Sequence, residues 1–339
     1  MVPRGLSSIL AAAVVLLPLT VQADEPILLR FGFPAPPQSK VNVWGVTPWI
    51  EDVQKAAPGV LDIKVFPGPA LATVENSYDR VVSGVADLMF GIFGPLAGKF
   101  SQVTVASLPF EAKNNSEVAV AYWRMYEKGL FASELSEVKT LALFSFPSFG
   151  FHTNKPVVSA ADIAGMKIAA SDRPISQFLT ILGAVPVTMG PPDFYQAMQR
   201  GLVSGVAVGW SAADTFKLYE VSKYHVDTSA GLFSAFMFMN KQSFAKLPQV
   251  AQQAIDRYSG EPFFRRMGKV TDDMNVEGRE KVRAMPGQIL SVLDAAEAER
   301  WKARVQPIID EWVKTTPNGA AILAAFRDEI KNVRAGTSR

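Results

Sequence analysis

The first part of the chain alternates between strand-like and helix-like patterns of apolar residues. Ile27–Phe33 is a short apolar run that ends at prolines, which is typical of a buried strand. Val46, Ile50 and Val53 recur at the spacing of one helix face. Strands that alternate with helices indicate an α/β unit with a largely parallel sheet. The predicted order is a strand at Ile27–Phe33, a helix at about Lys40–Ala57, a strand at Leu61–Phe66, a helix at about Val74–Ser83 and a strand at Ala86–Phe93.

A second unit of the same kind follows later in the chain. Ser159–Asp162 has the spacing of a helix capping box, and glycines close the helices that come after it. The predicted elements are strands at Lys167–Ala170, Val185–Thr188 and Val203–Trp210, with helices at Ile175–Leu182 and Asp193–Arg200. Two α/β lobes that face each other would leave a cleft between them, which is a usual place for a ligand.

A local signature is common to both units. In each, a tyrosine precedes a glycine that joins a helix to a strand, and a polar residue follows at the same spacing. The two sets are Tyr78, Gly84 and Asp87 in the first unit and Tyr195, Gly201 and Ser204 in the second. We expect a two-lobed pseudo-repeat; coincidence is the alternative, because helix–glycine–strand joints are common.

The last part of the chain is predicted to be helical. A stripe of apolar residues at helical spacing runs from Leu293 to Trp312, and Pro307 is expected to kink that helix. Pro317–Gly319 interrupts the pattern, which resumes from Ile322 to Val333. We expect these helices to pack against the lobes and to carry no chemistry.

The N-terminal residues resemble a secretory signal. Met1–Ala23 has a positive start at Arg4, an apolar middle at Ile9–Leu19 and a small-x-small end at Val21–Ala23. A retained membrane anchor is the alternative, but the apolar run is shorter than the ~20 residues that a spanning helix needs. We therefore predict a cleaved signal and a periplasmic protein that is not membrane-embedded. No cysteine follows the apolar run, so a lipid anchor is not expected.

Composition and charge narrow the function. The chain has 339 residues, is 48% hydrophobic and contains no cysteine, so a large core has to replace disulfides. Its formal net charge of +2 is too small and too evenly spread to indicate a nucleic-acid partner.

No catalytic or metal motif is present. The only two histidines, His152 and His225, lack partners at metal-ligand spacing, and neither a nucleophile elbow nor a phosphate loop occurs. We expect His152 to be a hydrogen-bonded loop residue. Carboxylates that meet only in the folded chain are the one catalytic arrangement left open. The sequence predicts a binding protein without a cofactor rather than an enzyme.

Several segments in a fixed order resemble one family, the DctP-type receptors of TRAP (tripartite ATP-independent periplasmic) transporters. Each segment alone is weak, but together they cover most of the chain. They are Asp62–Leu71, Ser83–Gly91, Ser107–Ala112, Thr153–Ile168, Leu182–Met189, Phe194–Gly205, Phe216–His225 and Met239–Pro248.

The resemblance implies an α/β periplasmic binding protein of two lobes, with hinge strands and a long C-terminal helix across both lobes. It implies a small organic solute in the cleft and delivery to a small and a large TRAP membrane subunit. A sensory receptor that presents its ligand to a membrane signalling protein is the alternative. The expected division is a signal at 1–23, lobe I at 24–150 plus about 232–270, lobe II at 151–231, and C-terminal helices at about 271–339.

The chain departs from the family where polar contacts to the solute are expected. The arginine by which many members hold a carboxylate corresponds to Ala169, and a second basic position corresponds to Phe149. Ala207 and Val208 stand where a glutamate and an asparagine are usual, and Ile92 or Phe93 replaces a polar residue. These changes predict an aromatic or weakly polar solute, with an acid as one option.

The resemblance suggests ten cleft residues, and for each aromatic ring an ordinary place in the core is the alternative. Arg173 either replaces the missing arginine or pairs in solvent with Asp172. Glu75 either faces the cleft or only favours a helix N-terminus. The full predicted set is Phe33, Glu75, Ile92, Phe93, Phe149, Phe151, Ala169, Arg173, Pro191 and Trp210.

Overall fold

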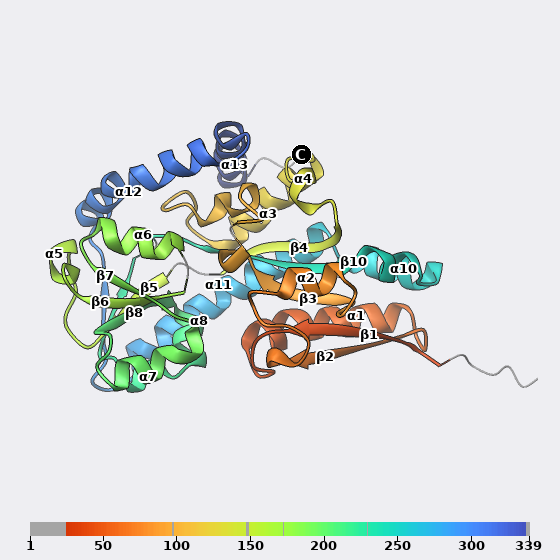
Figure 1. Ribbon diagram of the computed structural model, residues 1–339, viewed down its shortest axis with the longest axis horizontal. Coiled ribbons are helices and arrows are strands. Elements are labelled where there is room, and N and C mark those ends of the chain that lie inside the picture. Colours follow the sequence, from red (N-terminus) through yellow and green to blue (C-terminus); the bar gives the residue numbers. More distant parts are fainter. Residues whose placement is uncertain (1–24, 97, 147–148, 172, 229, 337–339) are drawn as a thin grey trace, which may run out of the picture.

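The chain folds into two lobes that lie side by side, each built around one mixed sheet (Figure 1). The computed structural model describes residues 25–96, 98–146, 149–171, 173–228 and 230–336. The predicted signal at 1–23 lies outside the described residues. No helix in the described ranges combines the length and the apolar character needed to cross a bilayer.

Lobe I is built on a five-stranded sheet in the order β2-β1-β3-β10-β4. The first three of these strands are parallel, and β10 runs antiparallel to both of its neighbours. The strands are β1 (Ile27–Phe33), β2 (Leu61–Pro67), β3 (Leu88–Ile92), β4 (Val138–Phe146) and β10 (Phe233–Asn240). The lobe I helices are α1 (Thr47–Ala56), α2 (Ser77–Val82), α3 (Asn115–Glu127), α4 (Ala132–Leu135), α9 (Lys241–Ala245) and α10 (Gln249–Tyr258).

The helix predicted at Lys40–Ala57 is divided in two. A π-helix at Val41–Val46 precedes α1, and Pro48 occupies the start of α1. Proline has no backbone N–H to continue the ladder, but its fixed φ suits a first helical turn. The proline therefore accounts for the change of helix type at this point.

Lobe II is built on a six-stranded sheet in the order β11-β9-β5-β8-β6-β7. The strands are β5 (Phe149–Thr153), β6 (Lys167–Ala170), β7 (Val185–Thr188), β8 (Gly205–Gly209), β9 (Tyr224–Asp227) and β11 (Ile289–Val292). Its helices are α5 (Ala160–Ile163), α6 (Arg173–Ile181), α7 (Phe194–Gln199) and α8 (Trp210–Thr215). The predicted capping box at Ser159 and Asp162 is formed.

The two lobes repeat the same local joint. Gly84 and Gly201 both have positive φ, 73° and 69°, which a residue without Cβ adopts at no steric cost. After each glycine, a backbone N–H donates to a neighbouring strand of its lobe: Asp87 to the Arg30 carbonyl of β1 at 2.9 Å, and Ser204 to the Lys167 carbonyl of β6 at 2.8 Å. The predicted pseudo-repeat is therefore present in the hydrogen bonding of both lobes.

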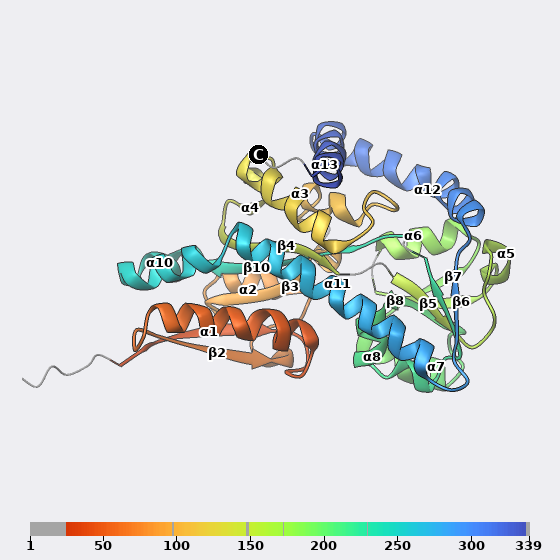
Figure 2. The ribbon, with the colours of Figure 1, turned by 180° about the vertical axis from the view of Figure 1, so that it is seen from behind.

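Two chain crossings and one long helix connect the lobes. β4 of lobe I leads to β5 of lobe II, and the chain returns from β9 to β10. Helix α11 (Glu261–Ala284) contacts α3 and β4 in lobe I and α8 and β11 in lobe II, and it runs behind both lobes (Figure 2). The predicted fold class is confirmed, while the exact lobe boundaries stay a prediction.

Glycines allow α11 to lie close to both lobes. A Cβ on Gly268 would be 2.7 Å from the Cβ of Ala119 in α3. A Cβ on Gly278 would be 2.7 Å from the Cβ of Trp210 in α8. Real Cβ atoms do not approach so closely, so α11 can take this position only with glycine at both points.

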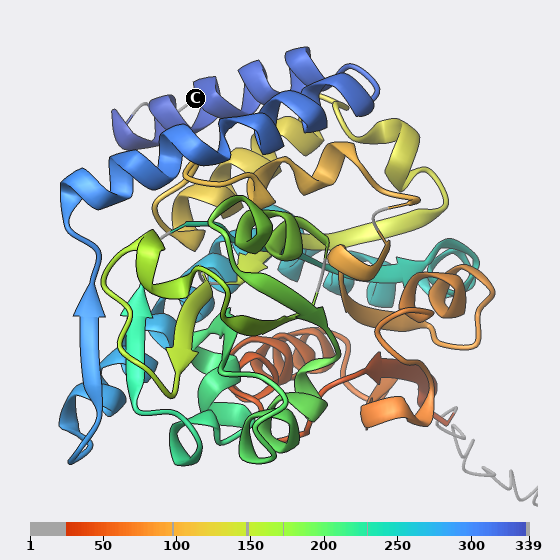
Figure 3. The same cartoon turned by 60° about the vertical axis from the view of Figure 1, so that its left-hand side comes forward.

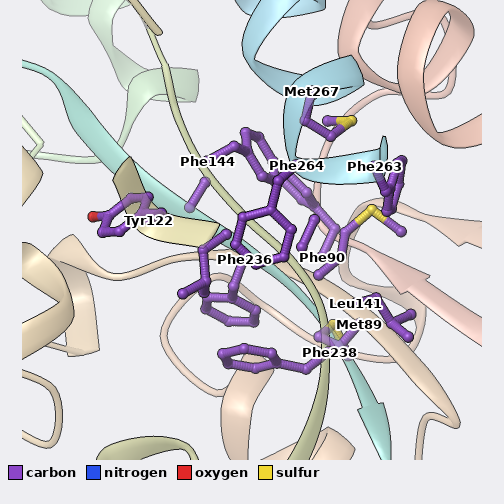
Figure 4. Packing of buried hydrophobic residues seen from close by; sticks show 14 of the residues in the cluster. Met89, Phe90, Tyr122, Leu141, Phe144, Phe236, Phe238, Phe263, Phe264 and Met267 are labelled. Atoms are coloured by element: carbon purple, nitrogen blue, oxygen red, sulfur yellow. The ribbon is translucent and has the colours of Figure 1, made fainter. Parts of the chain in front are cut away.

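The core of lobe I is rich in aromatic rings. The rings of Phe90 and Phe144 lie 6.1 Å apart, Phe236 stacks on Phe238 at 4.1 Å, and Phe263 and Phe264 of α11 belong to the same hydrophobic cluster (Figure 4). Aromatic rings bury large areas and interlock edge to face. This packing supplies, in a chain without cysteine, the stability that disulfides give to many exported proteins.

The C-terminal helices α12 (Ala295–Thr315) and α13 (Gly319–Arg334) lie over the top of both lobes (Figure 3). Arg334 forms a two-bond ion pair with Glu117 of α3, with both distances 2.8 Å. Arg327 holds Glu111 in the same way. The predicted packing of a helical tail on the lobes is thus observed.

Candidate functional site

A cavity of about 190 Å³ lies between the lobes. Lobe I contributes the loop after β1, the end of β3 and the last residue of β4; lobe II contributes the end of β8 and helix α8. Met274 of α11 also lines it. The walls thus come from segments that are far apart in the sequence, and a molecule in the cavity would touch both lobes.

Four phenylalanines line this cavity: Phe90, Phe146 and Phe233 from lobe I and Phe216 from lobe II. Phe90 and Phe146 meet edge to face with centroids 6.0 Å apart. Other apolar side chains, among them Val208, fill most of the remaining wall. Such a surface favours the burial of an apolar molecule and offers little to a strongly hydrated one.

Lys40 is the one charged side chain among the described residues that line the cavity. Its Nζ lies 2.6 Å from Glu277 Oε1 on α11 and 3.5 Å from Asp214 Oδ2 in lobe II. Asp214 also pairs with Lys281. The ammonium charge of Lys40 is thus balanced by two carboxylates, and the contact with Asp214 joins the two lobes.

Two of the predicted site residues, Ile92 and Pro191, line the cavity. Phe33 lies directly behind a lining residue, with its ring 4.8 Å from that of Phe90. Phe93 is buried in the lobe I core, 4.9 Å from the ring of Phe236. Ile92 and Phe93 differ because successive strand residues point to opposite faces.

The predicted residues Phe149, Phe151 and Ala169 do not line this cavity. The rings of Phe149 and Phe151 share one face of β5 and pack in the lobe II core, where Phe151 lies 5.8 Å from Trp301. Phe149 also lines a second cavity on the other side of the hinge. Ala169 is fully buried in β6.

Trp210 and Glu75 also lie outside the described cavity wall. Trp210 has no exposed surface, and its ring meets the ring of His152 edge to face at 5.0 Å. Its neighbours in the chain line the cavity instead. Glu75 is exposed just before α2, and Arg173 begins α6 with its side chain outside the described residues. Contact with solute stays a prediction for all ten residues.

The two histidines form a buried pair. The prediction of a loop for His152 is wrong: the residue lies in β5, an inner strand that pairs with β8 on one side and β9 on the other. Its Nδ1 is 2.8 Å from His225 Nδ1, and its Nε2 is 3.1 Å from the Val208 carbonyl oxygen. Burial lowers the pKa of both imidazoles. Neither ring faces a nucleophile, and the described residues hold no cluster of acidic and histidine side chains suited to a metal.

The sequence did not single out the cavity phenylalanines or Lys40. Phe90 and Phe216 stand inside the segments that resemble the family, but nothing in their local pattern separates them from the other phenylalanines of the chain. The prolines that end β1 were a usable signal, because the loop that they form builds one wall of the cavity.

Comparisons with known proteins agree with this architecture. Residues 34–316 match the family described as bacterial extracellular solute-binding protein, family 7 (DctP). The chain is 28% identical over 327 residues to the outer membrane transporter protein TsaT of Comamonas testosteroni, covering 94% of this chain and 95% of that protein.

Two solved structures are similar to both lobes together. A TRAP solute-binding protein of Rhodoferax ferrireducens with copurified benzoate has a TM-score of 0.86 and 27% identity, covering 92% of this chain and all of that one. A marine metagenome TRAP protein with 3-hydroxybenzoate has a TM-score of 0.85 and 27% identity, covering 91% and 99%. With the family match spanning most of its length, the chain belongs to family 7 of the bacterial extracellular solute-binding proteins, the DctP family.

Proposed function

We propose that this protein is a periplasmic TRAP receptor that binds a small aromatic solute between its lobes. The observation that carries the proposal is the inter-lobe cavity with its four phenylalanines. A ligand that touches both lobes favours the arrangement in which they meet, and this selects the form that docks on the membrane subunits.

The size of the cavity favours a single ring. A dry apolar cavity of about 150 Å³ in another protein binds benzene. The cavity here measures about 190 Å³, which leaves room for one ring and a small substituent. The similar structures with bound benzoate and 3-hydroxybenzoate support this solute class.

The polar part of the solute is held differently from the family pattern. Ala169 removes the guanidinium that would pair with a carboxylate, and the charge of Lys40 is already balanced. The hydroxyl-bearing residues of the wall are Ser39, Ser171, Ser211 and Thr215. We therefore expect the ring to supply most of the affinity, and one or two neutral hydrogen bonds to orient the solute.

Export and delivery complete the proposal. The N-terminal residues have the layout of a cleaved signal, and the family is one of extracellular binding proteins. We expect the loaded receptor to pass its solute to one small and one large TRAP membrane subunit. Uptake of labelled solute that stops when the receptor is deleted would separate this role from a purely sensory one.

The test is a binding panel on the mature protein. Native mass spectrometry first identifies any copurified molecule, and thermal shifts follow with benzoate, 3-hydroxybenzoate, benzamide and succinate. A solute at about 100 times its Kd stabilises the fold by about 2.7 kcal/mol, so the aromatic compounds should raise Tm by several degrees. A large shift with succinate and none with the three aromatic compounds would overturn the proposal.

A variant pair then locates the site. Phe216→Ala removes a lining ring of lobe II and should weaken binding of the best aromatic compound about tenfold or more, because a buried phenylalanine contributes ~1.5–3 kcal/mol. Phe244→Ala is the control, since Phe244 is similarly half-buried but lies in α9 of lobe I, outside the cavity wall. Equal affinities of the two variants by calorimetry would place the solute elsewhere.

A further inference from the structure

Helix α12 is anchored in both lobes. Trp301, Val305 and Ile308 of this helix belong to the same hydrophobic cluster as Phe151 of lobe II. The next residue, Ile309, belongs to the lobe I cluster instead, and Trp312 and Val313 pack against that cluster. The anchorage therefore changes from lobe II to lobe I within a single helix.

Pro307 stands directly before this change-over, inside the helix. A proline within a helix has no N–H to donate to the carbonyl four residues earlier, and its ring crowds that carbonyl. The helix is thus weakest where its two anchors separate. A bend at this point costs less than it would in an uninterrupted helix.

The cavity behind the hinge lies under this helix. It measures about 260 Å³ and is lined by Thr104 of lobe I, by residues of α6 in lobe II and by Trp312 of α12. Phe233 lines both this rear cavity and the inter-lobe cavity, so the hinge segment that holds it separates the two. A rotation about the hinge that widens the inter-lobe cavity must narrow the rear cavity.

One hydrogen bond fixes the lobe I end of α12. Trp312 Nε1 donates to Thr104 Oγ1 at 3.0 Å, between α12 and the 3₁₀ segment Gln102–Ser107. The bond is made in a structure whose lobes also meet across the cleft through Lys40 and Asp214. The bond thus ties the end of α12 to lobe I in the arrangement in which the lobes are together.

We propose that α12 is a strap that crosses behind the hinge, and that Trp312 is a positioning residue that sets solute affinity without touching the solute. When the lobes rotate apart, α12 has to bend at Pro307 or release Thr104. A bend at Pro307 leaves the Trp312–Thr104 bond intact, whereas release breaks it. We infer that opening proceeds by release, so the contact shifts the population toward lobes that are together. The inference does not depend on which solute the cleft takes.

The experiment measures the lobe arrangement directly. The chain has no cysteine, so Thr73→Cys in lobe I and Gln196→Cys in lobe II, both exposed, can be labelled with a dye pair without interference. Single-molecule energy transfer then reports the inter-lobe distance without solute. Trp312→Phe and Thr104→Val each remove the hydrogen bond and should shift the population toward longer distances.

Two further variants make the result specific. The double variant Trp312→Phe/Thr104→Val should shift the distances no more than the larger single change, because both remove the same bond. Tyr195→Phe removes a hydrogen bond to Glu220 that lies wholly within lobe II and should leave the distances unchanged. Unchanged distances in both single variants, or an equal shift in Tyr195→Phe, would overturn the proposal.

Binding gives a second readout. With benzoate as the probe, Trp312→Phe should lower affinity roughly 2- to 10-fold, mainly through faster dissociation, which corresponds to one net hydrogen bond. If benzoate does not bind the parent protein but the distances still shift, the proposed solute class fails and the strap stands. If benzoate binds the parent and both single variants equally well, with unchanged distances, the strap fails and the solute class stands.

Discussion

At the scale of single residues, hydrogen bonding and burial oppose each other at the histidine pair: a hydrogen bond between the two Nδ1 atoms, 2.8 Å apart, needs a proton, and burial disfavours the charge that this proton brings. The Val208 carbonyl can only accept, so His152 Nε2 carries a proton. Gln288 donates its Nε2 to the Tyr219 carbonyl at 3.0 Å and turns its Oε1 toward His225 Nε2, 2.7 Å away. That nitrogen is then protonated as well. A third proton, between the two Nδ1 atoms, would place a net charge in a site that water does not reach.

This pair makes stability depend on pH. Burial lowers the pKa of both histidines in the folded protein below the ordinary value near 6.5. Below that pH, the unfolded chain therefore binds more protons than the folded chain does. Their contribution is therefore complete above about pH 6.5 and falls as the pH drops below it. Calorimetry should show a lower Tm and a smaller free energy of unfolding at pH 5 than at pH 7.5.

Nuclear magnetic resonance can assign this effect, because the chain has only two histidines. We expect neither imidazole of the folded protein to titrate near its ordinary pKa. A ring that titrates near pH 6.5 would contradict the prediction and would show that the buried site accepts the charge.

At the scale of elements, the close contact of α11 with both lobes depends on glycine. Gly278→Ala would place a Cβ 2.7 Å from Trp210 Cβ and 3.2 Å from the Trp210 carbonyl carbon. Alanine is the better helix former by ~1 kcal/mol, but the overlap with backbone should outweigh that gain. We expect a net destabilisation of about 1–3 kcal/mol in urea unfolding. Glu280→Ala, at an exposed position of the same helix, should change stability by less than about 0.5 kcal/mol.

A stabilised Gly278→Ala variant would mean that α11 can move away from lobe II at little cost. Helix α11 would then not fix its own distance from α8. The position of α8, which forms part of the cleft wall, would vary more. The prediction therefore also tests how firmly α11 positions one side of the inter-lobe cavity.

At the scale of the whole molecule, the charge contact across the cleft links solute binding to lobe position. Lys40→Met keeps the apolar stem in the cavity wall but removes the ammonium near Asp214 and Glu277. Partly exposed ion pairs contribute ~0.2–1 kcal/mol, so affinity for an aromatic probe should fall about two- to fivefold at low salt.

Salt provides the control for this prediction. At 1 M salt the charges of the parent protein are screened, so its affinity should approach that of Lys40→Met. Lys269→Met removes an ion pair with Asp273 that lies within α11 and should change nothing. Calorimetric titrations that give equal affinities for parent and Lys40→Met at low salt would contradict a role in lobe closure.

The order of elements could be read from the sequence because it follows from local patterns. β1, β6 and β7 begin and end where the apolar runs predict, and prolines and glycines end several elements at the expected residues. The strands β4 and β10 and the 24-residue helix α11 were not foreseen from periodicity. The two strands are buried along almost their whole length, and continuous burial removes the polar positions that make a period visible. Helix α11 keeps an exposed polar face, with Arg265, Lys269 and Asp273 on it, so this reason does not apply to the helix.

The sequence by itself determined the two α/β units and the absence of catalytic motifs, because each depends on residue type or on near neighbours. Only the tertiary structure decided which side chains meet at the cleft. It placed Ile92 in the wall and Phe93 in the core, buried Trp210 beside the histidines, and brought together lining phenylalanines from both lobes. The direction of a side chain depends on strand register and on distant packing partners, and neither is encoded in the pattern around that residue.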